Sequence, residues 1–384
     1  MRPSATLAIS AKAAAMRKEG IDVISFGAGE PDFDTPQHIK QAAIEAINSG
    51  FTKYTPASGT PELKEAIAEK LKRENGLDYS PSQIIVSCGA KHSIYNALMA
   101  ICDPGDEVII ISPYWVSYPE MVRLAGGVPV IVETEMENDY LPSPDAIRSK
   151  ISPKTKAIIV NSPSNPTGSV CTEEILREIG ELAVEGDFYI ISDEIYEKLI
   201  YDGLRHVSIA ALDERFKERT ILINGVSKSY SMTGWRIGYA AGPEEVISAM
   251  SRIQSHSTSN PTSISQAAAL EALRGPQEEV ERMRAEFERR RELICGKLDE
   301  IEGIRYFKPK GAFYVFVDVS AFYEKLGVRG SVEFADHLLE KAKVALVPGV
   351  AFGDDRCVRL SFATSDEAIV EGLERIKAAL GGGR

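Results

Sequence analysis

Short apolar runs that alternate with helix-like segments restrict the fold of this chain more than any other feature of its sequence. Each run is rich in Ile and Val and is bounded by Gly, Pro, Asn or Asp. The runs cover residues 84–87, 107–112, 128–132, 157–161, 189–192 and 220–223. Such runs are typical of strands in a parallel sheet whose two faces are covered by helices. The sequence therefore predicts an α/β domain around one large sheet, from about residue 41 to about residue 280.

The pattern changes near residue 276. Residues 278–298 predict one long, highly charged helix, and we interpret it as solvent-exposed and stabilised by ion pairs one turn apart. The segments after it predict a smaller α+β domain. Its expected strands cover 311–319, 344–348 and 356–363, and its expected helices cover 331–341 and the C-terminus.

The composition indicates a soluble globular protein and narrows its function. A chain of 384 residues that is 44% apolar can form two domains with sizeable cores. The formal net charge of -12, with no dense Lys/Arg block, argues against nucleic acid as a partner. The five cysteines and five histidines lack metal-ligand spacing, so we expect reduced thiols and no metal site. No apolar run has the length of a signal core or a membrane span, which predicts a cytoplasmic protein without membrane contact.

The segment 227–238 contains one lysine, Lys228, among small hydroxyl residues and glycines, and an arginine, Arg236, eight positions later. A lysine that forms an imine with an aldehyde needs close packing, a lowered pKa and a nearby cation or phosphate. The planar fork of an arginine suits a phosphate. The segment therefore predicts a pyridoxal 5'-phosphate (PLP) site with Lys228 as the Schiff-base residue. The alternative is a loop with two solvated cations.

Two polar residues follow strands of the predicted sheet. Asn165 lies in a turn made rigid by two prolines, and its amide can donate to a phenolic oxygen and to a substrate carboxylate. Asp193 ends the next run, where a carboxylate can bind a protonated pyridine nitrogen, and Tyr196 could donate to the ring oxygen. Because ligands of open parallel sheets lie at the carboxyl ends of strands, these residues can share one cleft. The alternatives are a simple turn at Asn165 and a helix N-cap at Asp193.

Three further segments predict parts of the same cleft. Gly89 and Ala90 join a strand to a helix and let backbone N–H groups approach a phosphate, with Lys91 as a cation beside them. Trp115 can stack on a pyridine ring, or it can be a core aromatic residue. Arg359 lies in an apolar strand and needs a partner, either a protein acid or a substrate carboxylate.

Assembled in order, these motifs resemble those of the class-I aminotransferases of PLP fold type I. The chain is most similar to the bacterial aspartate aminotransferases that use a lysine for the substrate side-chain carboxylate. The resemblance rests on residues 29–36, 53–54, 113–118, 165–168, 192–196, 227–228, 234–238 and 359–361. It implies a mostly parallel seven-stranded sheet and a smaller α+β domain. The implied organisation is an N-terminal arm with part of the small domain (1–40), a large PLP-binding domain (41–280) and a small C-terminal domain (281–384).

The resemblance also implies a role for each candidate residue. Lys228 is similar to the lysine that binds the cofactor and moves the substrate proton, Asp193 to the pyridine-nitrogen partner, and Trp115 to the stacking aromatic residue. Asn165 and Tyr196 match the residues on the ring oxygen. The implied phosphate region comprises Gly89, Ala90, Lys91, Ser227 and Arg236. The implied substrate site comprises Gly29, Lys91, Trp115, Asn165 and Arg359, with Arg359 on the α-carboxylate.

Assembly and substrate follow from the same resemblance. Tyr54 resembles the tyrosine that reaches the phosphate of the other subunit, which implies a homodimer with shared active sites. Lys91 stands where the lysine-using branch binds the distal carboxylate, and residues 255–261 lack the arginine that the other branch uses. The implied reaction transfers the amino group of L-aspartate to 2-oxoglutarate. Alternatives are an aspartate/prephenate aminotransferase, for which Arg2 replaces the usual N-terminal lysine, and an aromatic or neutral amino acid aminotransferase.

Rival functions are a PLP lyase of the same fold and a non-catalytic PLP-fold module such as the effector domain of a transcription regulator. The second rival carries an added DNA-binding segment, for which the chain has no room before residue 21. A Rossmann-type dehydrogenase is disfavoured because the chain lacks a G-x-G-x-x-G fingerprint.

Overall fold

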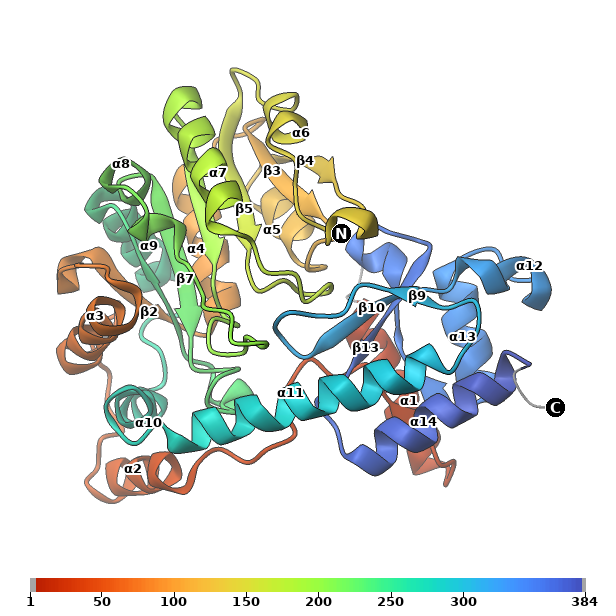
Figure 1. Cartoon of the computed structure of the whole chain (residues 1–384). Coiled ribbons are helices and arrows are strands. Elements are labelled where there is room, and N and C mark those ends of the chain that lie inside the picture. The colour runs from red at the N-terminus through yellow and green to blue at the C-terminus, as the bar shows by residue number, and fades with distance from the viewer. Residues whose placement is uncertain (1–4, 382–384) are drawn as a thin grey trace.

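The computed structural model describes residues 5–381, so Arg2, which was considered for prephenate, lies outside the described residues. Its largest sheet has seven strands, with helices on both faces (Figure 1). In spatial order these are β2 (Ile84–Ser87), β8 (Gly238–Ala241), β7 (Thr220–Gly225), β6 (Tyr189–Asp193), β5 (Thr155–Asn161), β3 (Glu107–Ser112) and β4 (Val128–Glu133). β8 runs antiparallel to both neighbours, whereas all other neighbouring strands are parallel. The predicted α/β fold with a mostly parallel sheet is confirmed.

Both faces of this sheet are buried because successive side chains of a strand point to opposite sides. In β5, for example, Ala157 and Ile159 pack in one core, and Ile158 and Val160 pack in another. The first core includes α4 (Ala90–Ile101), α5 (Tyr118–Leu124) and α9 (Glu244–Ser257). The second includes α6 (Pro144–Arg148), α7 (Glu173–Gly186) and α8 (Glu214–Lys217). A third core, against β2 and β8, includes α2 (Gln37–Asn48), α3 (Pro61–Asn75) and α10 (Ser263–Arg274).

The smaller part of the structure is built on a four-stranded antiparallel sheet. Its strands, in spatial order, are β12 (Val347–Pro348), β13 (Cys357–Ser361), β10 (Tyr314–Asp318) and β9 (Arg305–Tyr306). A separate parallel pair, β1 (Ile24–Ser25) with β11 (Val344–Ala345), brings the N-terminal segment to this part of the fold. The helices here are α1 (Ala5–Lys18), α11 (Glu278–Asp299), α12 (Tyr323–Leu326), α13 (Ser331–Lys341) and α14 (Asp366–Ala379). The exact domain boundaries stay a prediction.

Strand β8 and helix α11 differ most from what the sequence predicts. Strand β8 was not predicted, because Gly-Tyr-Ala-Ala contains no β-branched residue. The interpretation of α11 as a solvent-exposed helix is wrong, since one of its faces buries Val280, Met283, Phe287 and Ile294. The long helix passes beside both sheets (Figure 1), so its apolar face packs on protein while its other face carries ion pairs. The many Glu and Arg residues of α11 make this apolar stripe difficult to recognise in the sequence.

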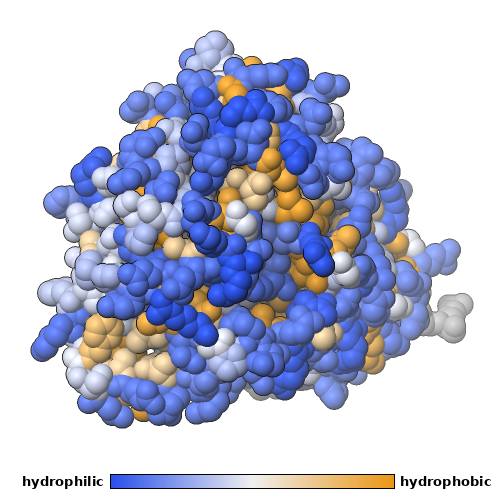
Figure 2. Space-filling view, turned by 60° about the vertical axis from the view of Figure 1, so that its left-hand side comes forward, coloured by the Kyte–Doolittle hydropathy of each residue, from blue (hydrophilic) through white to orange (hydrophobic). Residues whose placement is uncertain are grey.

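The surface is mostly hydrophilic on the face that Figure 2 shows, and apolar groups gather there mainly in hollows. Exposed large apolar side chains nevertheless occur close together in sequence on α2 and in the loop after it. They are Ile44, Ile47, Phe51 and Tyr54, of which Tyr54 is 92% exposed. Within residues 5–381, no helix has both the length and the apolarity needed to cross a membrane.

Gly238, the first residue of β8, lies directly against the start of α4. A Cβ atom at this position would be 2.1 Å from the backbone nitrogen of Ala90 and 2.4 Å from the carbonyl carbon of Gly89. We therefore expect Gly238→Ala to lower the free energy of unfolding by about 1–3 kcal/mol in denaturant titrations. The control is Gly296→Ala in α11, where a Cβ would meet nothing within 4 Å and where alanine favours the helix. Equal stability of the two variants would contradict this close packing.

Candidate active site

A cavity of about 530 Å³ lies at the carboxyl ends of strands of the large sheet and is closed on one side by the smaller sheet. It collects most of the predicted site residues. These are Gly29, Ala90, Lys91, Trp115, Asn165, Asp193, Tyr196, Ser227, Lys228, Arg236 and Arg359. Two predicted residues do not line it. Gly89 directly precedes Ala90, and the side chain of Tyr54 is exposed to solvent.

Lys228 follows strand β7 and extends its amine into this cavity. Its Nζ donates a hydrogen bond to the carbonyl oxygen of Gly29, 2.5 Å away. Burial, followed by the positive charge of Arg359, lowers the pKa of the Lys228 amine to about 8. A sizeable fraction of the amine is therefore neutral near physiological pH and can attack an aldehyde.

Asp193 ends strand β6 and is buried beneath the cavity. The hydroxyl of Tyr118 donates to its Oδ2 at 2.6 Å, and the amide of Ile195 donates to its Oδ1 at 3.3 Å. Burial raises the pKa of the Asp193 carboxyl to about 6, although both hydrogen bonds favour the ionised form. No helix begins at Asp193, so the N-cap alternative is wrong. The carboxylate is thus held in place and open to one more cationic partner.

Arg359, in strand β13 of the smaller sheet, is a buried cation that lines the cavity. Its Nη1 donates to the amide oxygen of Asn165 and its Nη2 donates to the carbonyl of Gly27, both at 3.0 Å. The guanidinium lies 4.3 Å from the ring centre of Tyr314 and 5.1 Å from that of Phe352. Within residues 5–381 no carboxylate forms an ion pair with it, and its Nε has no hydrogen-bond partner. Of the two alternatives for this arginine, an external carboxylate therefore fits better than a protein acid.

The start of α4 and two basic residues, Lys91 and Arg236, line one part of the cavity. Gly89 precedes the helix with a φ of 92°, and a Cβ there would be 2.4 Å from Nη2 of Arg236. Glycine thus lets the guanidinium lie against the helix N-terminus, where free backbone N–H groups favour an anion. The Nζ of Lys91 lies 4.8 Å from the ring centre of Trp115. Burial and the charge of Arg236 lower the pKa of Lys91.

Comparison with known proteins agrees with this geometry. A model of the family described as aminotransferase class I and II matches residues 21–376. The chain belongs to this family. It is 56% identical to the aspartate aminotransferase of Bacillus subtilis (strain 168), with 98% of this chain and 96% of that protein aligned. It is 50% identical to the aspartate/prephenate aminotransferase of Thermus thermophilus, with 99% and 97% aligned.

Solved aminotransferase structures have the same fold. The aspartate aminotransferase from Thermus thermophilus with maleate superimposes with a TM-score of 0.94 at 50% identity, covering 99% of this chain and 97% of that one. An aspartate aminotransferase from Rhizobium meliloti also gives 0.94, at 46% identity, covering 99% and 96%. These findings confirm the family, the fold and the transaminase class that the sequence predicts.

Tyr118 and Tyr314 are among the residues of this aminotransferase cavity that had no predicted role. Tyr118 holds Asp193, and it lies in the segment 113–118 that carries part of the resemblance, so the motif contained the signal. Tyr314 contributes the ring under Arg359, and its hydroxyl lies 2.9 Å from that of Tyr196. In sequence Tyr314 is one more aromatic residue of an apolar strand. Only the pairing of β10 with β13 brings it to the site.

Proposed function

We propose that this aminotransferase uses PLP to transfer the amino group of L-aspartate to 2-oxoglutarate, giving oxaloacetate and L-glutamate. The observation that carries the proposal is one cavity lined by a lysine of lowered pKa and by a buried arginine that has no acidic partner among residues 5–381. The names of the similar proteins support the same substrate. The test is a spectrum of the purified protein with PLP. We expect a yellow absorbance that bleaches on adding aspartate, with oxaloacetate formed, and a colourless protein would contradict the proposal.

The residues present fit PLP at each of its polar groups. The helix start at Ala90, together with Ser227 and Arg236, offers donors and a positive charge for the phosphate. Lys228 is an amine for the aldehyde, and Asp193 is an anion for the pyridine nitrogen. When bound, PLP supplies an aldehyde and a ring that stabilises negative charge at the substrate Cα.

The chain's own residues would then orient the substrate and move its proton. Arg359 would bind the α-carboxylate with a guanidinium that stacking and two hydrogen bonds already hold in one orientation. Lys228 Nζ would act as the general base that removes the proton from Cα. A cationic partner would keep Asp193 ionised by lowering its pKa. Tyr196 and Asn165 would donate to the ring oxygen.

We also infer that two copies of the chain share their active sites. Tyr54 lies 92% exposed, and Ile44, Ile47 and Phe51 expose apolar surface nearby in the sequence. Such a surface favours a protein partner, and a second copy would bring Tyr54 to the partner's phosphate site. Light scattering should give the mass of a dimer. A mixture of inactive Tyr54→Ala and inactive Lys228→Ala chains should regain activity, because hybrid dimers contain one intact site.

Lys91 decides which amino acids are accepted in this proposal. We expect Lys91→Ala to lower kcat/KM for aspartate about 10–100-fold, because a charge-assisted hydrogen bond to the side-chain carboxylate is lost. The value for alanine, which has no such carboxylate, should change little. Steady-state kinetics with both substrates would measure this, with Lys72→Ala, an exposed lysine, as the control. Equal losses for both substrates would assign Lys91 to the phosphate instead.

Prephenate is a second candidate substrate. Several relatives at 50–52% identity are named aspartate/prephenate or probable aspartate/prephenate aminotransferases. Assays with prephenate as the amino acceptor, beside 2-oxoglutarate, would decide between a single and a dual activity.

A further inference from the structure

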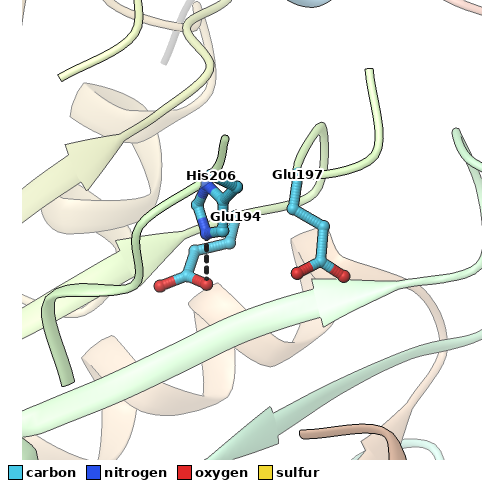
Figure 3. A group of neighbouring side chains, drawn as sticks. All are labelled: Glu194, Glu197 and His206. Atoms are coloured by element: carbon cyan, nitrogen blue, oxygen red, sulfur yellow. Dashed lines mark hydrogen bonds and ion pairs between the residues drawn. The ribbon is translucent and has the colours of Figure 1, made fainter. Parts of the chain in front are cut away.

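Only some side chains of the segment Asp193–Glu197 face the cavity. Asp193, Ile195 and Tyr196 line it, whereas Glu194 and Glu197 are buried elsewhere in the protein. There they meet His206, as Figure 3 shows. The side chains of Glu194, Glu197 and His206 are only 2%, 8% and 8% exposed. Two carboxylates are thus buried directly behind the residues that face the cavity, and each needs compensation.

Glu194 is fully partnered. Its Oε1 accepts hydrogen bonds from the hydroxyls of Ser192, at 2.9 Å, and Ser208, at 2.7 Å. Its Oε2 lies 2.8 Å from Nε2 of His206. All three contacts of the Glu194 carboxyl group are therefore with groups that can donate a hydrogen bond.

Glu197 has its own cation. Lys70, a buried lysine of α3, forms an ion pair with its Oε1, and Asn75 donates to its Oε2 at 2.9 Å. Lys70 also lies 3.7 Å from Glu74, which in turn pairs with Lys198 at 2.6 Å. Glu194, Glu197 and His206 offer ligand-type atoms within 4.8 Å of one another. Because Lys70 pairs with Glu197 and three hydrogen-bond donors surround Glu194, we interpret the group as an ion-pair network and not as a metal site.

Lys70 pairs with Glu197, and both Lys198 and Arg73 pair with Glu74. Among residues 5–381, His206 is the one basic side chain that contacts Glu194, so a neutral His206 would leave this buried carboxyl group without a cation beside it. Burial alone would lower the pKa of His206, but Glu194 and Glu197 outweigh burial and the opposing charge of Lys70 and raise it. The charge of Glu194 in turn acts on Asp193, whose pKa it raises.

We propose that His206 is a positioning residue of the active site, an imidazolium that holds Glu194 behind Asp193 and offsets its charge. The inference rests on the proposed function, because Asp193 acts there on the cofactor ring. With His206 charged, Asp193 is the single net negative charge that this segment presents to the cavity. If His206 were neutral, the negative charge of Glu194 would add to that of Asp193 and would stabilise every protonated form of the bound cofactor.

The first test uses NMR of the cofactor-free protein with ¹⁵N-labelled histidine. We expect the ring nitrogens of His206 to show the imidazolium form at pH 7 in the wild type. In Glu194→Gln, which removes the main anion, His206 should become neutral at the same pH. A neutral His206 in the wild type would overturn the inference while leaving the proposed function intact.

The second test follows the pH midpoint of the absorbance change of bound PLP. In His206→Gln, which keeps a donor but removes the charge, we expect the midpoint to rise by about half a pH unit or more. The double variant Glu194→Gln/His206→Gln should return to the wild-type midpoint, because the lost charges compensate. A residue with a merely structural role would lower thermal stability without moving the midpoint.

The matched control is His38→Gln. His38 forms a similar pair with Glu271, at 2.8 Å between α2 and α10, outside the cavity. This variant should keep the wild-type midpoint. An unchanged midpoint in His206→Gln, or an equal rise in the double variant, would overturn the inference. A wild-type protein that shows no absorbance with PLP would contradict the proposed function as well.

Discussion

Lys228→Ala is expected to lower transamination by about 10⁴-fold or more, because one side chain serves as both imine-forming amine and general base. The variant should also lack the yellow absorbance of the wild type with PLP, which a spectrum measures directly. Its fold should be unchanged, since the amine of Lys228 donates one hydrogen bond, to Gly29, and forms no ion pair within residues 5–381. Lys310→Ala, which loses a lysine paired with Asp139 on the surface, should keep both activity and absorbance. Normal turnover by Lys228→Ala would end the assignment.

The lowered pKa of Lys228 gives this prediction a pH dependence. Only the neutral amine reacts with an aldehyde, so the rate at which the cofactor-free protein captures PLP should rise with pH and level off above about 8. At pH 7 a pKa of about 8 leaves roughly a tenth of the amine neutral, against roughly one part in 3,000 for an ordinary lysine. Stopped-flow absorbance would measure the profile. A rate that still increases steeply up to pH 10 would show that burial and Arg359 do not lower this pKa.

The sequence predicts the chemistry of the site well because its residues lie in short segments with local signals. Lys228, Asp193 and Asn165 each follow an Ile- and Val-rich strand, and parallel strands bring their carboxyl ends to one edge of the sheet. This rule explains why residues that are far apart in the chain line one cavity. Arg359 was recognisable as a charge in an apolar strand.

The site residues that the sequence does not reveal reach the site through contacts between segments far apart in the chain. Tyr314 reaches Tyr196 and Arg359 only because β10 pairs with β13. His206 reaches Glu194 only because the chain returns behind β6, and a lone histidine in a loop carries no local signal. Side chains that hold site residues from behind are therefore found from the structure and not from a motif.

Replacing Arg359 is expected to lower activity without lowering the stability of the fold. Arg359 is 2% exposed and has no carboxylate partner within residues 5–381, so folding removes its charge from water without an ion pair in return. We expect Arg359→Leu to lower kcat/KM about 10²–10⁴-fold for every amino acid, since two charge-assisted hydrogen bonds to the α-carboxylate are lost. Thermal unfolding should show no loss of stability. Arg359→Lys should recover only part of the activity, because an ammonium lacks the planar fork.

Arg291 is the matched control, because it is an equally buried arginine that has acidic partners. It is 1% exposed and pairs with Asp202 through both Nη atoms, at 2.6 and 2.7 Å, and with Glu292. Arg291→Leu should therefore destabilise the protein by about 1–3 kcal/mol while the folded fraction keeps normal kinetics. The two variants should thus show opposite effects, activity lost without stability at position 359 and stability lost without activity at position 291. If Arg359→Leu instead unfolded the protein as readily as Arg291→Leu, Arg359 would be a structural residue and the substrate carboxylate would need another partner.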